Sequence, residues 1–205
     1  MRILVFGDSI TQGFHDLERG GWCNRLAIQA MNVSVESDWE TDVSVLNLGI
    51  GGDSLDRLHE RFETEFRRRC SDICVTIFAF GINDSMSDTE GNCRVELTAF
   101  EKLYSEYIAL AQSKGKVILV GLVPIDEVQL NPIPWFQTHS CLQSNRDAFN
   151  AVVERIATES GCSYVSLSDV YDASTHTIDG IHPNAVGHQL IFERVKETLE
   201  AAGIL

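Results

Sequence analysis

The first apolar run of the chain, Ile3-Leu4-Val5-Phe6, is followed at once by Gly7-Asp8-Ser9-Ile10. Its apolar character is continuous rather than alternating, which is typical of a strand in a parallel sheet covered by helices on both faces. Similar short runs recur along the chain, and the expected strands are residues 2–6, 43–48, 73–80, 117–122 and 163–167. The sequence therefore predicts a five-stranded, mainly parallel sheet.

Amphipathic stretches separate these runs. In residues 54–69, for example, apolar side chains recur every three or four positions, and charged side chains occupy the other face. The expected helices are residues 54–69, 95–113, 149–160 and 185–202, and Gly115, Gly161 and Gly203 are expected to end the last three of them. Alternating strands and helices predict an α/β fold, a flavodoxin-like three-layer α/β/α sandwich, in a single domain over residues 1–205.

The chain is acidic, with 16 basic and 30 acidic side chains among 205 residues and a formal net charge of −14. Lys and Arg supply most of the affinity for phosphates, so nucleic acid and anionic membrane surfaces are not expected as partners. The first apolar run is shorter than the roughly 7–15 residues of a signal peptide. No run approaches the ~20 residues of a membrane span. We expect a cytoplasmic protein.

The six cysteines are expected to be reduced structural thiols. The chain is not a short, cysteine-dense secreted scaffold, and Cys74 lies in an apolar run as a small buried hydrophobe would. Cys70 and Cys74 are four residues apart, with no second cysteine pair and no histidine pair nearby, which is not the spacing of a metal site. We expect neither metal nor cofactor.

Unusual residues gather where the expected strands end. Two long loops, residues 13–21 and 124–140, follow strands and should emerge at the carboxyl edge of the sheet, where open α/β folds bind ligands. Four polar or glycine-rich segments share that edge: Gly7-Asp8-Ser9-Ile10-Thr11, Gly49-Ile50-Gly51-Gly52-Asp53, Gly81-Ile82-Asn83-Asp84 and Asp179-Gly180-Ile181-His182-Pro183. They contain a nucleophile, a base, a carboxylate and hydrogen-bond donors, which are the components of serine acyl transfer.

Each segment also has a purely structural interpretation. Ser9 can cap the first turn after its strand, and Asp179 to Pro183 can be a turn that leads into a helix. The glycines can mark a tight turn, and Asn83-Asp84 can cap a helix. The other histidines, at positions 15, 59, 139, 176 and 188, lack a carboxylate three residues earlier in a turn at this edge, which makes them weaker candidates for the base.

Taken together, the four segments resemble, in order and spacing, the conserved blocks of the SGNH (GDSL-type) hydrolase superfamily. Ile10 replaces the family's usual Leu, a change that conserves volume. Thr11 stands where a GxSxG motif has its second glycine, so we do not expect the nucleophile elbow of α/β-hydrolases, the sharp turn that carries their serine. The resemblance implies Ser9 as nucleophile, His182 as base and Asp179 as its orienting carboxylate. It also implies an oxyanion hole made by the backbone N–H groups of Ser9 and Gly52 and the side chain of Asn83.

The family resemblance implies a serine esterase that acts on a small-molecule ester through an acyl-enzyme, with short-chain or acetyl esters favoured. Thioesterases, lysophospholipases and carbohydrate deacetylases share these motifs and stay open. Trp135 and Phe136, in the loop 124–140, either line the substrate site or pack on the sheet. A different class is a flavin- or phosphate-binding module, because Ser9 and Thr11 place hydroxyls in the loop that binds phosphate in flavodoxin-like folds.

Overall fold

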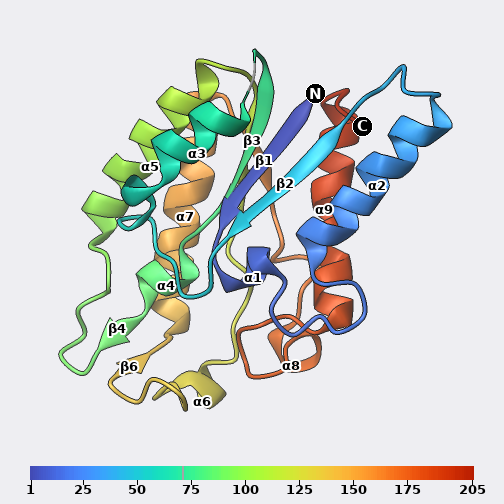
Figure 1. Cartoon of the computed structure of the whole chain (residues 1–205). Helices are drawn as coiled ribbons and strands as arrows, with labels where there is room; N and C mark the ends of the chain where they lie inside the picture. Colours follow the sequence, from blue (N-terminus) through green and yellow to red (C-terminus); the bar gives the residue numbers. More distant parts are fainter. Residues whose placement is uncertain (71) are drawn as a thin grey trace.

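The computed structural model describes residues 1–70 and 72–205. Its main sheet has five strands in the order β2-β1-β3-β5-β7, and every neighbouring pair is parallel (Figure 1). The predicted sheet is therefore confirmed, and its strand order is that of flavodoxin-like folds. The strands are β1 (Arg2–Gly7), β2 (Ser44–Gly49), β3 (Cys74–Ala79), β5 (Val117–Val120) and β7 (Ser163–Val165).

Helices cover both faces of this sheet, as predicted for an α/β/α sandwich (Figure 1). One face carries α3 (Phe62–Arg69), α5 (Leu97–Gln112) and α7 (Gln143–Ser160), and the other carries α2 (Trp22–Glu36) and α9 (Ala185–Ala201). None of the described helices is both long and apolar enough to cross a membrane.

Short elements gather at the carboxyl ends of the strands, at the bottom of Figure 1. The sheet thus presents its loops at one edge, where the sequence predicts the site. These elements are α1 (Ser9–Gln12), α4 (Ile82–Ser85), α6 (Glu127–Leu130), α8 (Ala173–His176), β4 (Ser87–Asp88) and β6 (His139–Ser140), the last two forming a small antiparallel ladder.

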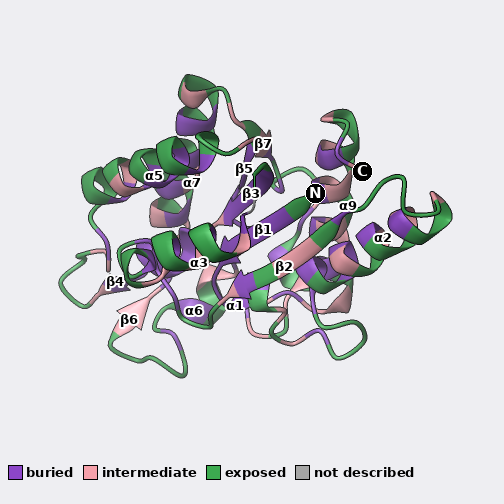
Figure 2. Cartoon of the chain, turned by 45° about the horizontal axis from the view of Figure 1, so that its top comes forward, coloured by how far each residue is buried: buried purple, intermediate pink, exposed green. Residues whose placement is uncertain are grey.

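The central strands form the core. Ile3 to Phe6 are fully buried, and Figure 2 shows buried residues along β1 and β3 and exposed residues on the outer faces of the helices. Phe6 packs against Phe62 of α3, with ring centroids 5.0 Å apart, and against Phe78 of β3 at 5.9 Å. Burying a side chain of this kind stabilises the fold by about 1.5–3 kcal/mol, so the strand that leads to Ser9 is held firmly.

Three helical segments differ from the expectation. The helix α2 was not predicted, although Trp22, Leu26 and Ala30 bury one of its faces. The predicted helix 54–69 is interrupted: a short 3₁₀ turn η1 (Leu58–Glu60) precedes α3. The first residues of the predicted helix contact the edge of the sheet instead, because Leu55 donates its backbone N–H to Asp84 Oδ1 at 2.8 Å. Helix α7 begins at Gln143, ahead of the expected residue 149.

The expectation of six reduced thiols is wrong for one pair, because Cys70 and Cys74 form a disulfide. Helix α3 ends just before Cys70 and β3 begins at Cys74, and the Cα atoms of the two cysteines are 5.5 Å apart, a normal separation for such a bond. The other four cysteines, at positions 23, 93, 141 and 162, are free. The sequence argument for a reducing compartment loses this part of its support.

Candidate active site

Ser9 lies at the first position of α1, directly beyond the end of β1. The preceding Asp8 caps this helix, since its Oδ1 accepts the backbone N–H of Ile10 at 2.9 Å. The structural interpretation of Ser9 as a helix cap therefore fails, and its hydroxyl is free for another partner. Gly49 allows α1 to pack closely on the end of β2, because a Cβ there would lie only 2.5 Å from the backbone nitrogen of Gln12.

A chain of hydrogen bonds joins Ser9, His182 and Asp179. Ser9 Oγ lies 2.9 Å from His182 Nε2, and His182 Nδ1 lies 2.7 Å from Asp179 Oδ2. A carboxylate can only accept, so Nδ1 carries the proton and Nε2 is left to accept from the serine hydroxyl. Ser9 and the distant pair Asp179 and His182 thus have the relative positions that a nucleophile, an orienting carboxylate and a base require.

The carboxylate of Asp179 is held in its charged form. Its Oδ1 accepts the backbone N–H groups of Ile181 at 3.2 Å and of His182 at 2.8 Å. Partial burial acts to raise the pKa of Asp179, but the hydrogen bonds from the ring and backbone of His182 and from Ile181 outweigh it and keep that pKa below its ordinary value of 3.8. A charged Asp179 can stabilise the imidazolium that forms when His182 takes a proton.

Potential oxyanion donors surround the serine. Asn83, in α4 after β3, donates from Nδ2 to the carbonyl of Asp53 at 2.9 Å and, more weakly, to Asp8 Oδ2 at 3.3 Å. Within the described part of the chain, no hydrogen bond uses the backbone N–H of Ser9 or of Gly52. Gly52 has a left-handed φ of 74°, and a Cβ there would meet nothing within 4 Å, so the turn leaves its surroundings open.

A cavity of about 270 Å³ opens over these groups. The sequence-predicted residues Ser9, Gly52, Asn83, His182 and Trp135 all line it, whereas Asp179 lies behind His182. Trp135 is 53% exposed, and the centroid of its ring lies 5.9 Å from that of the His182 imidazole.

Phe136, the other aromatic residue predicted to contact substrate, lies elsewhere. It is not among the residues that line the cavity, and it stacks on His139 with ring centroids 4.0 Å apart. The two neighbouring aromatic residues therefore have different surroundings, and Trp135 alone reaches the site.

Sequence reasoning missed Phe14 and His15. Phe14 lines the cavity 5.1 Å from the ring of His182, and His15 Nε2 lies 3.4 Å from Asp179 Oδ2. Both belong to the long loop 13–21, so that loop's length was the available signal. His188 of α9 anchors it: Nδ1 accepts the backbone N–H of Trp22 at 3.3 Å, and Nε2 donates to the Phe14 carbonyl at 3.0 Å.

The remaining histidines do not compete for the role of base. His59, His139 and His176 contact the backbone of Asp56, the ring of Phe136 and the backbone N–H of Asp172 respectively. His188 is buried, which lowers its pKa and favours the neutral ring that its two hydrogen bonds require. Only His182 reaches the serine among the six, all of which lie in the described residues.

Two buried carboxyls lie beneath the site. Burial raises the pKa of Asp8 to about 6, against the opposing hydrogen bond from Ile10 and the nearby His182. Burial raises the pKa of Asp84 to about 7, although Leu55 donates a hydrogen bond to it. Neither carboxyl has a hydrogen bond to the hydroxyl of Ser9, so we assign them no chemical step. Near neutral pH, the region therefore combines a charged Asp179 with carboxyls that are partly protonated.

Three potential metal ligands meet at the rim. His15 Nε2, Asp179 Oδ2 and a ring nitrogen of His182 lie within 4.8 Å of one another. The hydrogen bond between Asp179 and His182 already occupies two of these groups.

Comparison with known proteins places the chain among hydrolases. The model of the GDSL-like lipase/acylhydrolase family matches residues 5–190. A bovine (Bos taurus) isoamyl acetate-hydrolyzing esterase 1 homolog is 27% identical, over 97% of this chain and 81% of the relative.

Solved structures share the fold. A lipase/acylhydrolase from Enterococcus faecalis gives a TM-score of 0.74 at 21% identity, covering 98% of this chain and 96% of that chain. An acetylxylan esterase from Geobacillus stearothermophilus gives 0.70 at 18% identity, covering 97% and 93%. The family match takes in all four sequence segments that meet at the site. The chain therefore belongs to the GDSL-like lipase/acylhydrolase family and, as its motifs predicted, is a carboxylic ester hydrolase.

Proposed function

We propose that the protein is a serine esterase that hydrolyses short-chain, acetyl-type esters through a Ser-His-Asp triad. The observation that carries this proposal is the chain of hydrogen bonds from Ser9 Oγ through His182 to Asp179, with lengths of 2.9 and 2.7 Å. A serine hydroxyl is a weak nucleophile at neutral pH, and a correctly oriented imidazole is what activates it.

In the first step, Ser9 Oγ attacks the ester carbonyl carbon as His182 Nε2 takes the hydroxyl proton. The carbonyl oxygen becomes an oxyanion, stabilised by the backbone N–H groups of Ser9 and Gly52 and the amide of Asn83. The new imidazolium then gives its proton to the leaving alcohol oxygen as the C–O bond breaks. An acyl-enzyme remains on Ser9.

In the second step, water attacks the acyl carbon and gives a proton to His182 Nε2. The same donors stabilise the second oxyanion, and the bond to Ser9 Oγ breaks as the imidazolium returns the proton to it. The products are a carboxylic acid and the free enzyme. Throughout, Asp179 fixes the tautomer of His182 and stabilises its charge.

The preference for small acyl groups is supported by the size of the cavity and by similarity. A volume of about 270 Å³ suits a small ester and is below the range of most drug-sized pockets. Two similar proteins carry acetyl esters in their names, the isoamyl acetate-hydrolyzing esterase 1 homolog and the acetylxylan esterase. The net charge of −14 disfavours anionic substrates such as phospholipids.

A carbohydrate deacetylase is the second candidate, and Trp135 is the observation that favours it. Its half-exposed ring beside His182 could stack on a sugar that carries the acetyl group. Comparing an acetylated xylo-oligosaccharide with p-nitrophenyl acetate would separate the two candidates. The binding-module alternative has less support, because the Ser9 hydroxyl is already engaged by His182. A cytoplasmic location stays a prediction.

The decisive experiment compares native protein with Ser9→Ala on p-nitrophenyl acetate. We expect the substitution to abolish turnover and an alkyl phosphonate to label Ser9 in the native protein. The matched control is Ser105→Ala, which removes an exposed hydroxyl on α5 and should keep full activity. Full activity in Ser9→Ala, or phosphonate attached to another residue, would refute the proposal.

A further inference from the structure

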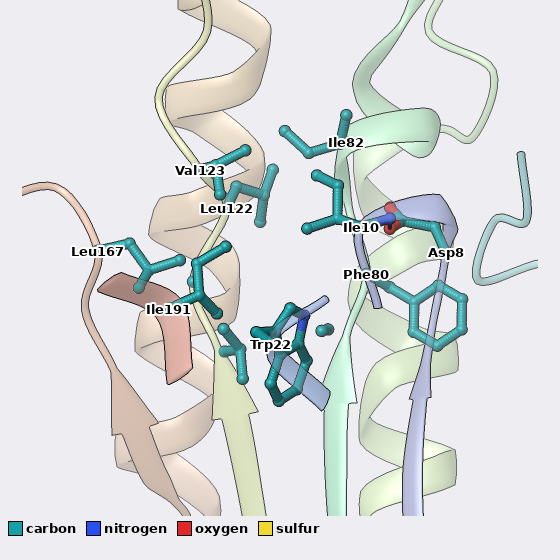
Figure 3. A pocket seen from close by; sticks show the side chains of 12 residues that line it. Asp8, Ile10, Trp22, Phe80, Ile82, Leu122, Val123, Leu167 and Ile191 are labelled. Carbon is teal, nitrogen blue, oxygen red and sulfur yellow. Dashed lines mark hydrogen bonds between the residues drawn. The ribbon is translucent and has the colours of Figure 1, made fainter. Parts of the chain in front are cut away.

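A second cavity lies behind the catalytic one. Its volume is about 30 Å³, and its lining is almost entirely buried and apolar. Figure 3 shows Ile10 and Ile82 opposite Leu122 and Val123, with Trp22 below them. Ile10 and Ile82 are the residues that line both cavities. They therefore form the wall between the open site and the buried space.

This wall lies beside the groups that would act on the substrate. Ile10 follows Ser9 in the chain, and Ile82 precedes Asn83. In a tetrahedral intermediate, the oxyanion faces its donors and the leaving oxygen must face His182, which protonates it. The remaining substituent on the carbon is the acyl chain. Ile10 and Ile82 offer it a buried apolar surface beside the serine.

The opposite side of the site is better suited to the alcohol. The rings of Phe14 and Trp135 both lie within 6 Å of the ring of His182, and both are substantially exposed. A bulky alcohol can therefore extend toward solvent past these rings. By contrast, Ile10 is 8% exposed and Ile82 is 5% exposed, so an acyl chain can advance only by displacing packed side chains.

Building on the proposed esterase function, we propose that Ile10 and Ile82 set the acyl-chain length and that the cavity behind them is the closed end of an acyl subsite. An acetyl group ends at this wall, and longer chains are rejected by it. The buried cavity is large enough for a small apolar group, since about 10–15 Å³ of such volume holds one water molecule. Shortening either side chain connects the two spaces.

The test measures kcat/KM for p-nitrophenyl hexanoate relative to p-nitrophenyl acetate. The native protein should strongly favour acetate, and Ile82→Ala and Ile10→Ala should each raise the hexanoate-to-acetate ratio about tenfold. The estimate takes between one and two of the four additional methylenes of hexanoate to become buried, at a gain of about fourfold each. Leu167 lines the far side of the buried cavity, and a phenylalanine there should fill it. The double variant Ile82→Ala, Leu167→Phe should therefore have a ratio closer to the native value.

A matched control separates this mechanism from general loosening of the core. Ile156→Ala shortens an equally buried isoleucine in α7 that lines neither cavity, and it should leave the ratio unchanged. If an alanine variant does not fold, as judged by circular dichroism, the corresponding valine variant replaces it. The valine variant removes one methylene, so its expected effect is about fourfold.

Three results would overturn the proposal: a native ratio near one, an unchanged ratio in folded Ile10 and Ile82 variants, or an equal rise in Ile156→Ala. In each of these cases acetate is still hydrolysed in a Ser9-dependent manner, and the esterase function stands. If native protein turned over none of the esters, the proposed function itself would fail.

Discussion

Asp84 is expected to destabilise the fold at neutral and alkaline pH. Its side chain is fully buried; Oδ1 accepts the backbone N–H of Leu55, and Oδ2 has no hydrogen-bond partner among the described residues. Burial and the nearby charges of Asp8 and Asp56 raise its pKa, and the hydrogen bonds to it do not compensate. The perturbation is Asp84→Asn, which keeps the shape and the acceptor for Leu55 but cannot ionise.

The magnitude follows from the rise in pKa from 3.8 to about 7. Unfolded protein loses this proton above pH 3.8, whereas folded protein keeps it until about pH 7, so stability falls as pH rises between these values. Because Asp84 ionises more readily in the unfolded chain, it destabilises the fold by about 4 kcal/mol at pH 8 and by about 2 kcal/mol at pH 5. Asp84→Asn removes this cost.

The assay is urea unfolding of native and variant protein at pH 8 and pH 5. The buried amide that Asp84→Asn introduces also loses hydrogen bonds to water, at a cost of about 1–3 kcal/mol that does not depend on pH. The quantity to compare is therefore the stability gained by Asp84→Asn over native protein at pH 8 minus the same gain at pH 5, which we expect to be about 2 kcal/mol.

Asp42→Asn is the control, because it removes a carboxylate at an exposed position. It should alter stability by less than about 0.5 kcal/mol at either pH. A stability difference between native protein and Asp84→Asn that is the same at pH 5 and pH 8 would refute the reasoning, since it would mean that Asp84 does not change its charge in the folded protein over this range.

Two further predictions concern the oxyanion hole and the loop 13–21. Asn83→Ala should lower kcat on p-nitrophenyl acetate by about 10²–10³, as loss of one oxyanion donor does; a change confined to KM would instead make Asn83 a substrate-positioning residue. Burial lowers the pKa of His188 below its ordinary value of 6.5. Below pH 6.5 the unfolded chain therefore binds a proton at this residue before the folded protein does, and acid should destabilise the fold. His188→Gln should remove that part of the acid sensitivity in urea unfolding at pH 5 and 7, and equal acid sensitivity in both proteins would contradict this role.

Much of the site could be predicted from sequence because its components follow buried strands. Ser9 follows β1 and Asn83 lies beyond β3, and these strands are neighbours in the sheet. A parallel sheet brings the ends of such strands to one edge whatever lies between them in sequence. The pairing of Asp179 with His182 was equally local, because three residues in a turn suffice to bring the carboxylate to the ring.

The residues that were missed depend on contacts between distant segments. His15 approaches Asp179 only because its backbone adopts a left-handed φ of 69° and because the loop is held by Asp16, Arg25 and His188. No local pattern carries this information. Trp135 and Phe136 could not be distinguished from the sequence either, because both are aromatic residues in the same loop. Only the path of the folded loop places Trp135 at the cavity and Phe136 against His139.

The components of the site also differ in how they are held. Ser9 and Asn83 lie on short helices at the ends of buried strands, whereas Asp179 and His182 lie on a loop between α8 and α9. That loop is fixed by backbone hydrogen bonds, including one of 2.8 Å from Asp126 to the carbonyl of Gly180. Because Asp126 belongs to the loop 124–140, the segment that carries Trp135 also supports the loop that carries His182. Substitutions there should therefore affect kcat as well as KM, since they move His182 relative to a serine that the sheet keeps in place.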